Sequence, residues 1–282
     1  MKPILSILAR RYIAGETITD AMSAAKQLYG DGLLAAIDNL GENVRDEQSS
    51  LAAVREYLKL LDDIICSGVR STVSVKLTQL GLDISDELAF QNAEAIAAKA
   101  LSQNNFVWLD MEGSAYTQRT IDIFLRLRKD RPNVGIAIQS CLKRSRADLR
   151  LLIERHACVR LVKGAYKEPP EISFKEKKDV DKNFEIMMRE LLLEGNRPAI
   201  ATHDPRLIEA AISFASERNI PSKDFEFQML LGIKRSLQKS LASRGYTVRV
   251  YIPYGTNWLP YTMRRLMERK ENIFFVIKNI FD

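Results

Sequence analysis

The sequence predicts an α/β protein that folds as a closed, TIM-like (βα)8 barrel with a short N-terminal helical extension. Eight short segments rich in Val, Ile, Leu or Phe alternate with helical patterns along the chain. Near-continuous apolar strands separated by helices are typical of parallel strands that are buried on both faces. Eight such units within about 250 residues match the usual size of this barrel. An open doubly wound sheet is the rival, but no GxGxxG follows any strand.

The expected elements follow one another with little chain between them. A first helix, capped by Thr17 or Thr19, completes the extension over about residues 1–30. Strands are expected at 33–38, 72–77, 105–111, 134–139, 159–163, 198–202, 225–230 and 247–251. Helices are expected at 47–66, 86–103, 115–129, 146–156, 179–194, 205–218 and 234–244. No low-complexity linker divides them, so residues 1–282 are expected to form a single domain.

Composition narrows the classes of partner. The formal charge is +6, but lysine and arginine are spread along the chain without a nucleic-acid-binding motif, which excludes nucleic acid as the expected partner. Weak attraction to an anionic membrane surface fits the charge better. The cysteines Cys66, Cys141 and Cys158 form no CxxC pair, so neither a disulfide framework nor a metal site is expected. No apolar run approaches the ~18 residues of a spanning helix. A cytoplasmic location is expected, with peripheral contact at the inner face of the cell membrane as an option.

Polar and charged side chains recur where the expected strands end. The carboxyl ends of all eight strands of such a barrel meet at one face, and its chemistry takes place there. A single polar residue at a strand end is usually a loop anchor or a member of an ion pair. Their recurrence predicts an active site that draws on Glu42, Lys76, Asp110, Glu112, Gln139, Arg160, Lys163, Thr202, His203, Asp204, Glu226, Gln228 and Tyr251.

Two lysines and a histidine leave the chemistry of this face open. Lys76 is either a Schiff-base nucleophile or an electrostatic partner of an anion, and Asp110 on the next strand favours the charged form and therefore the second role. Lys163 precedes Gly164, which lets a backbone approach a ligand closely, and this is a weak indication of a phosphate or flavin site. His203 lacks a neighbouring nucleophile or metal ligands, so a hydrogen bond to a cofactor is its better interpretation.

The segment after the last strand carries two adjacent arginines. Pro253 and Gly255 are expected to end the strand, and Pro260 suits the first turn of the next helix. Arg264 and Arg265 on that helix are placed to meet a ligand at its end, because guanidinium groups bind carboxylates through paired hydrogen bonds. A basic helix end in solvent is the ordinary alternative. Glu268, four residues after Arg264, is placed to hold that arginine.

Nine motifs run along the chain from about Arg10 onward. They are AGET (14–17), LGE (40–42), VKLTQLGLD (75–83), LDMEGS (109–114), IQSCL (138–142), RLVKGAY (160–166), ATHDPR (201–206), FEFQMLLGI (225–233) and YIPYGTNWLPYTMRR (251–265). In these motifs and their order the chain resembles the monofunctional bacterial proline dehydrogenases. The resemblance implies a distorted (βα)8 barrel that holds FAD, oxidises L-proline to Δ1-pyrroline-5-carboxylate by hydride transfer from C5 to flavin N5, and passes electrons to a membrane quinone.

The resemblance also implies roles for single residues. Asp110 and Arg160 would be catalytic, and Arg160 and Glu42 would form an ion pair that gates the site. The proline pocket would consist of Lys76, Leu230, Tyr251, Arg264 and Arg265, with Tyr251 against the ring and both arginines on the carboxylate. The FAD would be surrounded by Met111, Gln139, Arg160, Val162, Lys163, Gly164, Ala165, Thr202, His203 and Gln228.

Three other functions stay open on the sequence. A methylenetetrahydrofolate reductase-like flavin barrel would be reduced by NAD(P)H and not by proline. An aldolase that uses Lys76 or Lys163 would form a Schiff base that borohydride traps. A non-catalytic barrel would bind proline without turning it over.

Overall fold

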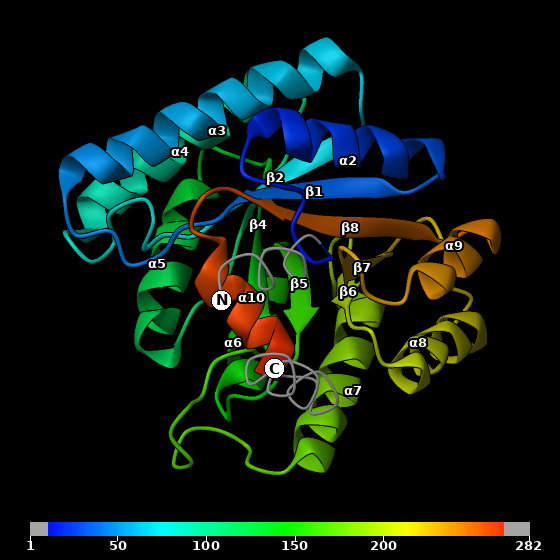
Figure 1. Cartoon of the computed structure of the whole chain (residues 1–282). Helices are drawn as coiled ribbons and strands as arrows, with labels where there is room; N and C mark the ends of the chain where they lie inside the picture. The colour runs from blue at the N-terminus through cyan, green and yellow to red at the C-terminus, as the bar shows by residue number, and fades with distance from the viewer. Residues whose placement is uncertain (1–10, 268–282) are drawn as a thin grey trace, which may run out of the picture.

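The computed structural model describes residues 11–267 and forms a closed barrel of parallel strands in which β8 pairs with β1 (Figure 1). Each strand pairs in parallel with the next along the chain. The strands are β1 Leu34–Asn39, β2 Ser71–Val75, β3 Val107–Leu109, β4 Val134–Gln139, β5 Cys158–Val162, β6 Ala199–Ala201, β7 Glu226–Leu230 and β8 Thr247–Tyr254. The predicted fold class is therefore confirmed.

Helices connect the strands and surround the barrel (Figure 1). They are α2 Ile18–Gly30, α3 Glu47–Ser67, α4 Asp86–Ser102, α5 Thr117–Leu127, α6 Ser145–Glu154, α7 Lys177–Glu194, α8 Pro205–Glu217, α9 Arg235–Ser243 and α10 Trp258–Met267, with a 3-10 turn η1 at Ser114–Tyr116. The predicted N-terminal helix corresponds to α2 where the chain is described, and residues 1–10 lie outside that range. A single domain over residues 1–282 stays a prediction. Within residues 11–267 no helix combines the length and apolar character needed to cross a membrane.

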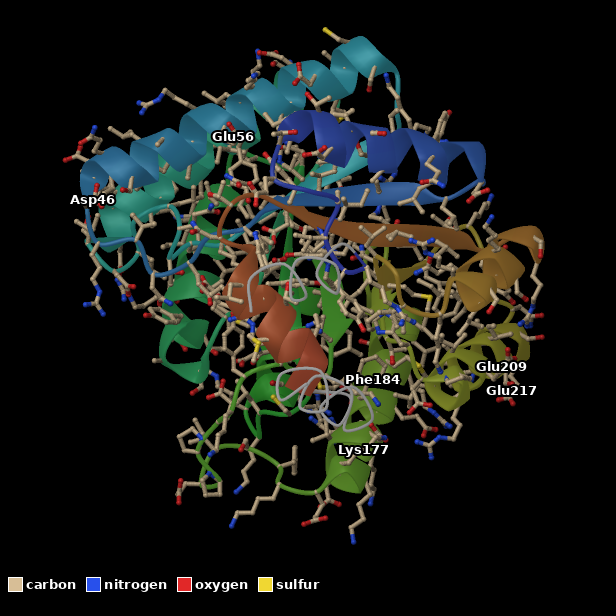
Figure 2. All side chains as sticks on the ribbon, in the orientation of Figure 1. Asp46, Glu56, Lys177, Phe184, Glu209 and Glu217 are labelled. Carbon is tan, nitrogen blue, oxygen red and sulfur yellow. The ribbon has the colours of Figure 1, made fainter. Side chains whose placement is uncertain are left out.

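Local sequence explains where several helices begin. Thr17 caps α2, where its hydroxyl accepts the backbone N–H of Asp20 while the Asp20 carboxylate accepts that of Thr17. Asp46 caps α3, where its carboxylate accepts the backbone N–H of Ser49, and it stands at the end of that helix (Figure 2). Asp204 caps α8 because its carboxylate accepts the backbone N–H of Arg206, and Pro205 supplies the fixed φ of the first turn.

The helices turn apolar faces to the barrel and charged faces outward. On α8, Leu207 and Ala211 are buried, whereas Glu209 and Glu217 are exposed on the outside (Figure 2). Phe184 on α7 is fully buried, although Lys177 at the start of the same helix is exposed. Burial of the apolar faces stabilises the barrel and leaves its carboxyl ends available for the site.

Side chains alternate along each strand between the helices and the interior of the barrel. Those that pack against the helices are apolar and fully buried, for example Ile37, Val73 and Leu161. Some of those that point inward are polar. Arg160 of β5, for example, reaches across the barrel and donates to the hydroxyl of Ser74 on β2. Barrels of this class are usually filled with Val, Ile and Leu. The polar interior is therefore a specific property of this chain and requires partners for each group.

The last strand extends further than predicted. Pro253 was expected to end it, but β8 continues to Tyr254, and Pro253 lies opposite Asp38 of β1. The missing N–H is tolerated near the end of the strand, and the Pro253 carbonyl accepts the backbone N–H of Ala14 at 2.9 Å. The N-terminal segment is thereby attached beside the carboxyl face.

A small apolar cluster at the carboxyl face joins this N-terminal segment to α10. Tyr12 and Ile13 are buried with Leu40, Ile233 and Tyr261, apart from the main core. Gly232 has φ +75°, and a Cβ built on it would lie 1.7 Å from the carbonyl oxygen of Arg11. Only glycine allows the two backbones to approach so closely.

Candidate active site

A cavity of about 700 Å³ opens among the carboxyl ends of the strands. Of the predicted site residues, it is lined by Lys76, Asp110, Met111, Gln139, Arg160, Val162, Lys163, Gly164, Ala165, Thr202, His203, Gln228, Leu230, Tyr251, Arg264 and Arg265. Glu42 touches this set through Arg264. Glu268 lies outside the described residues. The fold thus brings together residues from seven strands and α10, although their roles stay predictions.

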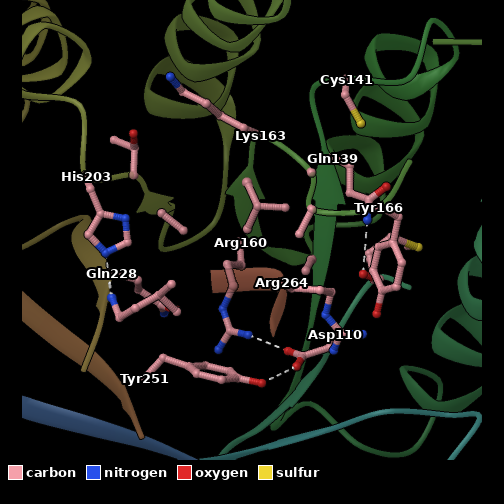
Figure 3. Close-up of a pocket in the computed structure, with 18 of the residues that line it drawn as sticks. Asp110, Gln139, Cys141, Arg160, Lys163, Tyr166, His203, Gln228, Tyr251 and Arg264 are labelled. Atoms are coloured by element: carbon pink, nitrogen blue, oxygen red, sulfur yellow. Dashed lines mark hydrogen bonds and ion pairs between the residues drawn. The ribbon is translucent and has the colours of Figure 1, made fainter. Parts of the chain in front are cut away.

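A buried ionic network forms the floor of this cavity. The Lys76 ammonium lies 2.8 Å from a carboxylate oxygen of Asp38 and 3.2 Å from one of Asp110. Arg160 donates to the other oxygen of Asp110 at 2.6 Å, and the Tyr251 hydroxyl donates to Asp110 at 2.7 Å (Figure 3). Asp38 is completely buried and Lys76 is 7% exposed. Such charges are tolerated inside a protein only because each is paired and hydrogen-bonded.

The network fixes the protonation states of its members. Burial acts against the charged form of Lys76, but Asp38 and Asp110 outweigh it and raise the pKa of the ammonium. Burial also acts against ionised Asp110, yet Lys76 and Arg160 prevail and lower its pKa. Burial and Asp110 raise the pKa of Tyr251. Lys76 is therefore an ammonium, as predicted, and a Schiff-base nucleophile at this position is disfavoured.

The arginine pair enters the cavity from α10. Arg264 donates to Glu42 at 2.6 Å and 3.3 Å, and its guanidinium lies 5.5 Å from the ring centre of Tyr166. The predicted ion pair between Glu42 and Arg160 is therefore wrong in this structure: Arg160 points into the barrel and is bound to Asp110. Arg265 also lines the cavity, and its guanidinium lies 5.4 Å from the ring centre of Tyr261.

Two glutamines present amides to the cavity. The Gln139 amide nitrogen donates to the carbonyls of Met111 and Glu112, both at 3.1 Å. Its oxygen is buried and has no partner among residues 11–267. The Gln228 nitrogen donates to Glu226 at 2.5 Å. Each amide therefore keeps an oxygen for a donor on a ligand.

His203 and Lys163 also line the cavity. The Nε2 atom of His203 accepts the backbone N–H of Leu230 at 2.7 Å, which places the proton of the neutral ring on Nδ1. Lys163 donates to Asp181 at 2.5 Å. Gly164 lines the cavity, and its φ of +110° and the nearby Cys141 side chain give a structural reason for glycine there. Approach of a ligand to its backbone stays a prediction.

Several residues of the site were not assigned a role from the sequence. Asp38 lies near the end of an apolar strand, and a single charge inside such a buried strand is the sequence signal that could have identified it. Tyr57 on α3 donates its hydroxyl to the Ser74 carbonyl at 2.8 Å and lies 3.3 Å from Asp38. Asp181 and Tyr166 also line the cavity. Nothing in the local sequence marks Asp181, because it lies on the solvent side of a helical pattern.

Fold and cavity together define a class of protein: a (βα)8-barrel enzyme with a cavity lined by charged and polar side chains at its carboxyl face. The model of the family described as "Proline dehydrogenase" matches residues 21–278. The chain belongs to the proline dehydrogenase family, whose members are in general flavoenzymes, and its function is the oxidation of proline. The reductase-like alternative is not favoured.

Relatives support this membership over almost the whole chain. Proline dehydrogenase 1 of Bacillus subtilis (strain 168) is 40% identical over 272 residues, which cover 96% of this chain and 90% of the relative. Proline dehydrogenase of Deinococcus radiodurans is 37% identical over 278 residues, covering 97% and 90%. The crystal structure of proline utilization A from Bdellovibrio bacteriovorus, inactivated by N-propargylglycine, superposes with a TM-score of 0.87 and 26% identity over 93% of this chain. The chain spans about a third (32%) of that longer protein.

Proposed function

We propose that this chain oxidises L-proline to Δ1-pyrroline-5-carboxylate with FAD bound in the same cavity. The observation that carries the proposal is the continuity of the cavity. At one end lie the cations Lys76, Arg264 and Arg265, and at the other end the strand ends of β4 to β7 supply amide, imidazole and lysine side chains. A small carboxylate and a larger cofactor therefore fit side by side.

The side chains at the β4 to β7 ends suit FAD. The oxygen of Gln139, which has no partner within residues 11–267, and the oxygen of the Gln228 amide offer acceptors to N–H groups of the isoalloxazine ring, and His203 lines the same cavity. Lys163 supplies positive charge for the phosphates. Thr202, Met111, Val162, Gly164 and Ala165 complete this end. FAD, when bound, would supply the acceptor for the hydride that leaves C5 of proline with both electrons of the C–H bond.

At the other end, α10 and β8 define the substrate pocket. Arg264 and Arg265 bind the proline carboxylate together with Lys76, and Tyr251 and Leu230 pack against the ring. The hydroxyl of Tyr251 is held by Asp110, so the aromatic ring is fixed before substrate arrives. Asp110 and Arg160 are assigned catalytic roles because both line the cavity where the ring lies against the cofactor.

The charge of this end favours the reactive form of proline. Lys76, Arg160 and Arg264 surround this end of the cavity with positive charge. Positive charge beside the ring nitrogen acts against its protonation and so favours proline with a neutral ring nitrogen. The lone pair of a neutral nitrogen can form the C=N bond as hydride leaves C5, whereas a protonated nitrogen has no lone pair to do so. No separate side-chain base is assigned.

Glu42 regulates access to the pocket in this proposal. Its carboxylate occupies Arg264, so the substrate carboxylate competes with it for the same guanidinium. Because of this competition, Glu42 acts as a gate that leaves Arg264 when substrate binds. Electrons then pass from the cofactor to a membrane quinone, and the net charge of +6 supports peripheral contact with an anionic surface.

Product analysis tests the function. The purified protein is incubated with L-proline and a soluble quinone, and the cyclic imine is trapped with o-aminobenzaldehyde. We expect stoichiometric imine and reduced quinone, and no turnover with NAD(P)H in place of proline. Absence of imine from protein that retains FAD would refute the proposed reaction.

A further inference from the structure

An ion pair inside the barrel lies directly beneath the amide of Gln228. Arg249 of β8 donates to both carboxylate oxygens of Glu226 on β7, at 2.8 Å and 2.9 Å. A third donor of Arg249 reaches the backbone carbonyl of Ala35 on β1 at 3.1 Å. The amide nitrogen of Gln228 donates to Glu226 at 2.5 Å. The pair thus connects three strands and ends on a residue that lines the cavity.

This arrangement allows one orientation of the Gln228 amide. An ionised carboxylate has no hydrogen to donate, so only the NH2 end of the amide can face Glu226. Burial opposes ionisation of Glu226, but Arg249 outweighs it and lowers the pKa of the carboxyl group. The oxygen of the same amide has no donor within residues 11–267. It is the part of Gln228 left for a ligand, and Gln228 is only 4% exposed.

Gln139 on β4 is oriented by a different means. Two backbone carbonyls hold its NH2 group, and its oxygen is likewise left without a donor in the described residues. These backbone carbonyls are fixed by the main chain and need no second side chain to orient them. Gln228 instead depends on a side-chain acceptor, and that acceptor depends on Arg249.

We propose that Glu226 and Arg249 are a positioning pair that holds the Gln228 amide with its oxygen toward the flavin, as an acceptor for an N–H of the ring. The inference rests on the proposed binding of FAD in this cavity. Neither Glu226 nor Arg249 lines the cavity, so their effect on the cofactor passes through Gln228. The ordinary alternative is an ion pair that only closes the barrel, and it makes a different prediction about coupling.

A thermodynamic cycle separates the two roles. Four proteins are compared: wild type, Gln228→Leu, the pair variant Glu226→Leu with Arg249→Met, and all three substitutions together. The pair variant removes both charges at once, so no unpaired charge is left inside the barrel. The dissociation constant of FAD is measured from the flavin fluorescence that appears when each holoenzyme is diluted, and thermal unfolding is recorded for each.

The cycle has a defined expected outcome. Gln228→Leu weakens FAD binding about 10-fold, the size of one buried hydrogen bond. The pair variant weakens FAD binding about 5-fold when Gln228 is present and less than about 2-fold in the Gln228→Leu background. Equal losses in both backgrounds, or no loss in either, would overturn the positioning role. A wild-type protein that binds no FAD would overturn the proposed function itself, which keeps the two failures apart.

A second pair variant and a control variant complete the experiment. If the pair variant does not fold, Glu226→Gln with Arg249→Met keeps both side-chain volumes, and an amide at position 226 can donate as well as accept, so the orientation of Gln228 is no longer imposed. The same background-dependent loss is expected, and equal losses again contradict the proposal. The matched control removes the exposed pair of Glu209 and Arg244, which are 2.9 Å apart, by substituting both with alanine. We expect unchanged FAD affinity.

Discussion

Asp110 is the residue on which most of the site converges. It accepts hydrogen bonds from Lys76, Arg160 and Tyr251, which come from three different strands. Lys76 has a second carboxylate, Asp38, which also favours its ammonium form. The residue-level consequence is that the charges around Asp110 are already paired before a ligand binds.

The arginine pair gives the first prediction at this scale. Arg264→Lys or Arg265→Lys removes the planar fork that binds a carboxylate through two bonds, although the positive charge remains. We expect each variant to raise the KM for proline at least ~10-fold, with a smaller change in kcat. Steady-state kinetics with L-proline measure the KM and kcat of each variant. The exposed Arg235→Lys serves as the control and should behave as wild type. Wild-type KM in both variants would contradict the carboxylate assignment.

Glu112 gives a prediction about pH. Burial is the largest influence on this carboxyl group and raises its pKa to about 7, against the hydrogen bonds from Thr78. The folded state therefore binds the proton more tightly than the unfolded state does. The contribution of Glu112 to stability is largest below the ordinary pKa of 4.5 and falls as the pH rises to about 7.

The variant Glu112→Gln isolates this effect, because an amide does not titrate. Between about pH 5 and about pH 8, the unfolding free energy of the variant should rise relative to wild type by up to about 3 kcal/mol. Urea unfolding at both pH values measures the difference. A constant difference between the two proteins would show that Glu112 is not a buried group with a raised pKa.

How far the sequence predicts the site depends on the range of each interaction. The recurrence of polar residues at strand ends predicted the cavity lining, because strand ends in a barrel converge whatever their sequence separation. Charge pairing could not be predicted in this way. Glu42 and Arg264 are 222 positions apart, and only the folded geometry shows that Arg264, not Arg160, reaches Glu42.

At the scale of elements, α10 depends on the opposite end of the chain. Tyr12 and Ile13 pack with Tyr261 of α10, and Glu16 accepts a hydrogen bond from Trp258 at the start of that helix. The strand pattern predicted β8 but not its extension through Pro253, because the partner of its carbonyl, Ala14, comes from the N-terminal segment. Contacts of this kind have no local signal.

Gly232 tests the attachment of that segment. Gly232→Ala combines a left-handed φ of +75° with a Cβ 1.7 Å from the Arg11 oxygen, so the N-terminal segment must move. We expect the unfolding free energy to fall by more than about 2 kcal/mol and the KM for proline to rise, because Tyr261 loses its packing partners. Denaturant unfolding and kinetics measure the two effects.

Gly245 provides the matched control. Its φ is +84°, but a Cβ there would meet nothing within 4 Å. Gly245→Ala should therefore cost only the conformational strain, about 1 kcal/mol, and leave the KM unchanged. Equal losses in the two variants would show that the contact with Arg11 is unimportant.

At the scale of the whole molecule, the barrel keeps an apolar shell and places polar groups inside it. The shell packs against the helices, and its near-continuous apolar strands are what made the fold predictable. The interior carries the ion pairs of Lys76, Arg160 and Arg249, each of which connects two different strands or strand ends. One barrel therefore serves as scaffold and as binding site, and family membership assigns proline oxidation to it.

The visible absorption spectrum before and after addition of L-proline tests the central claim most directly. The purified protein should be yellow, and proline should bleach the flavin band under anaerobic conditions in wild type, whereas the double variant Arg264→Lys with Arg265→Lys should need a much higher proline concentration. A colourless protein that takes up no FAD, or a flavin band that NAD(P)H bleaches and proline does not, would contradict the account.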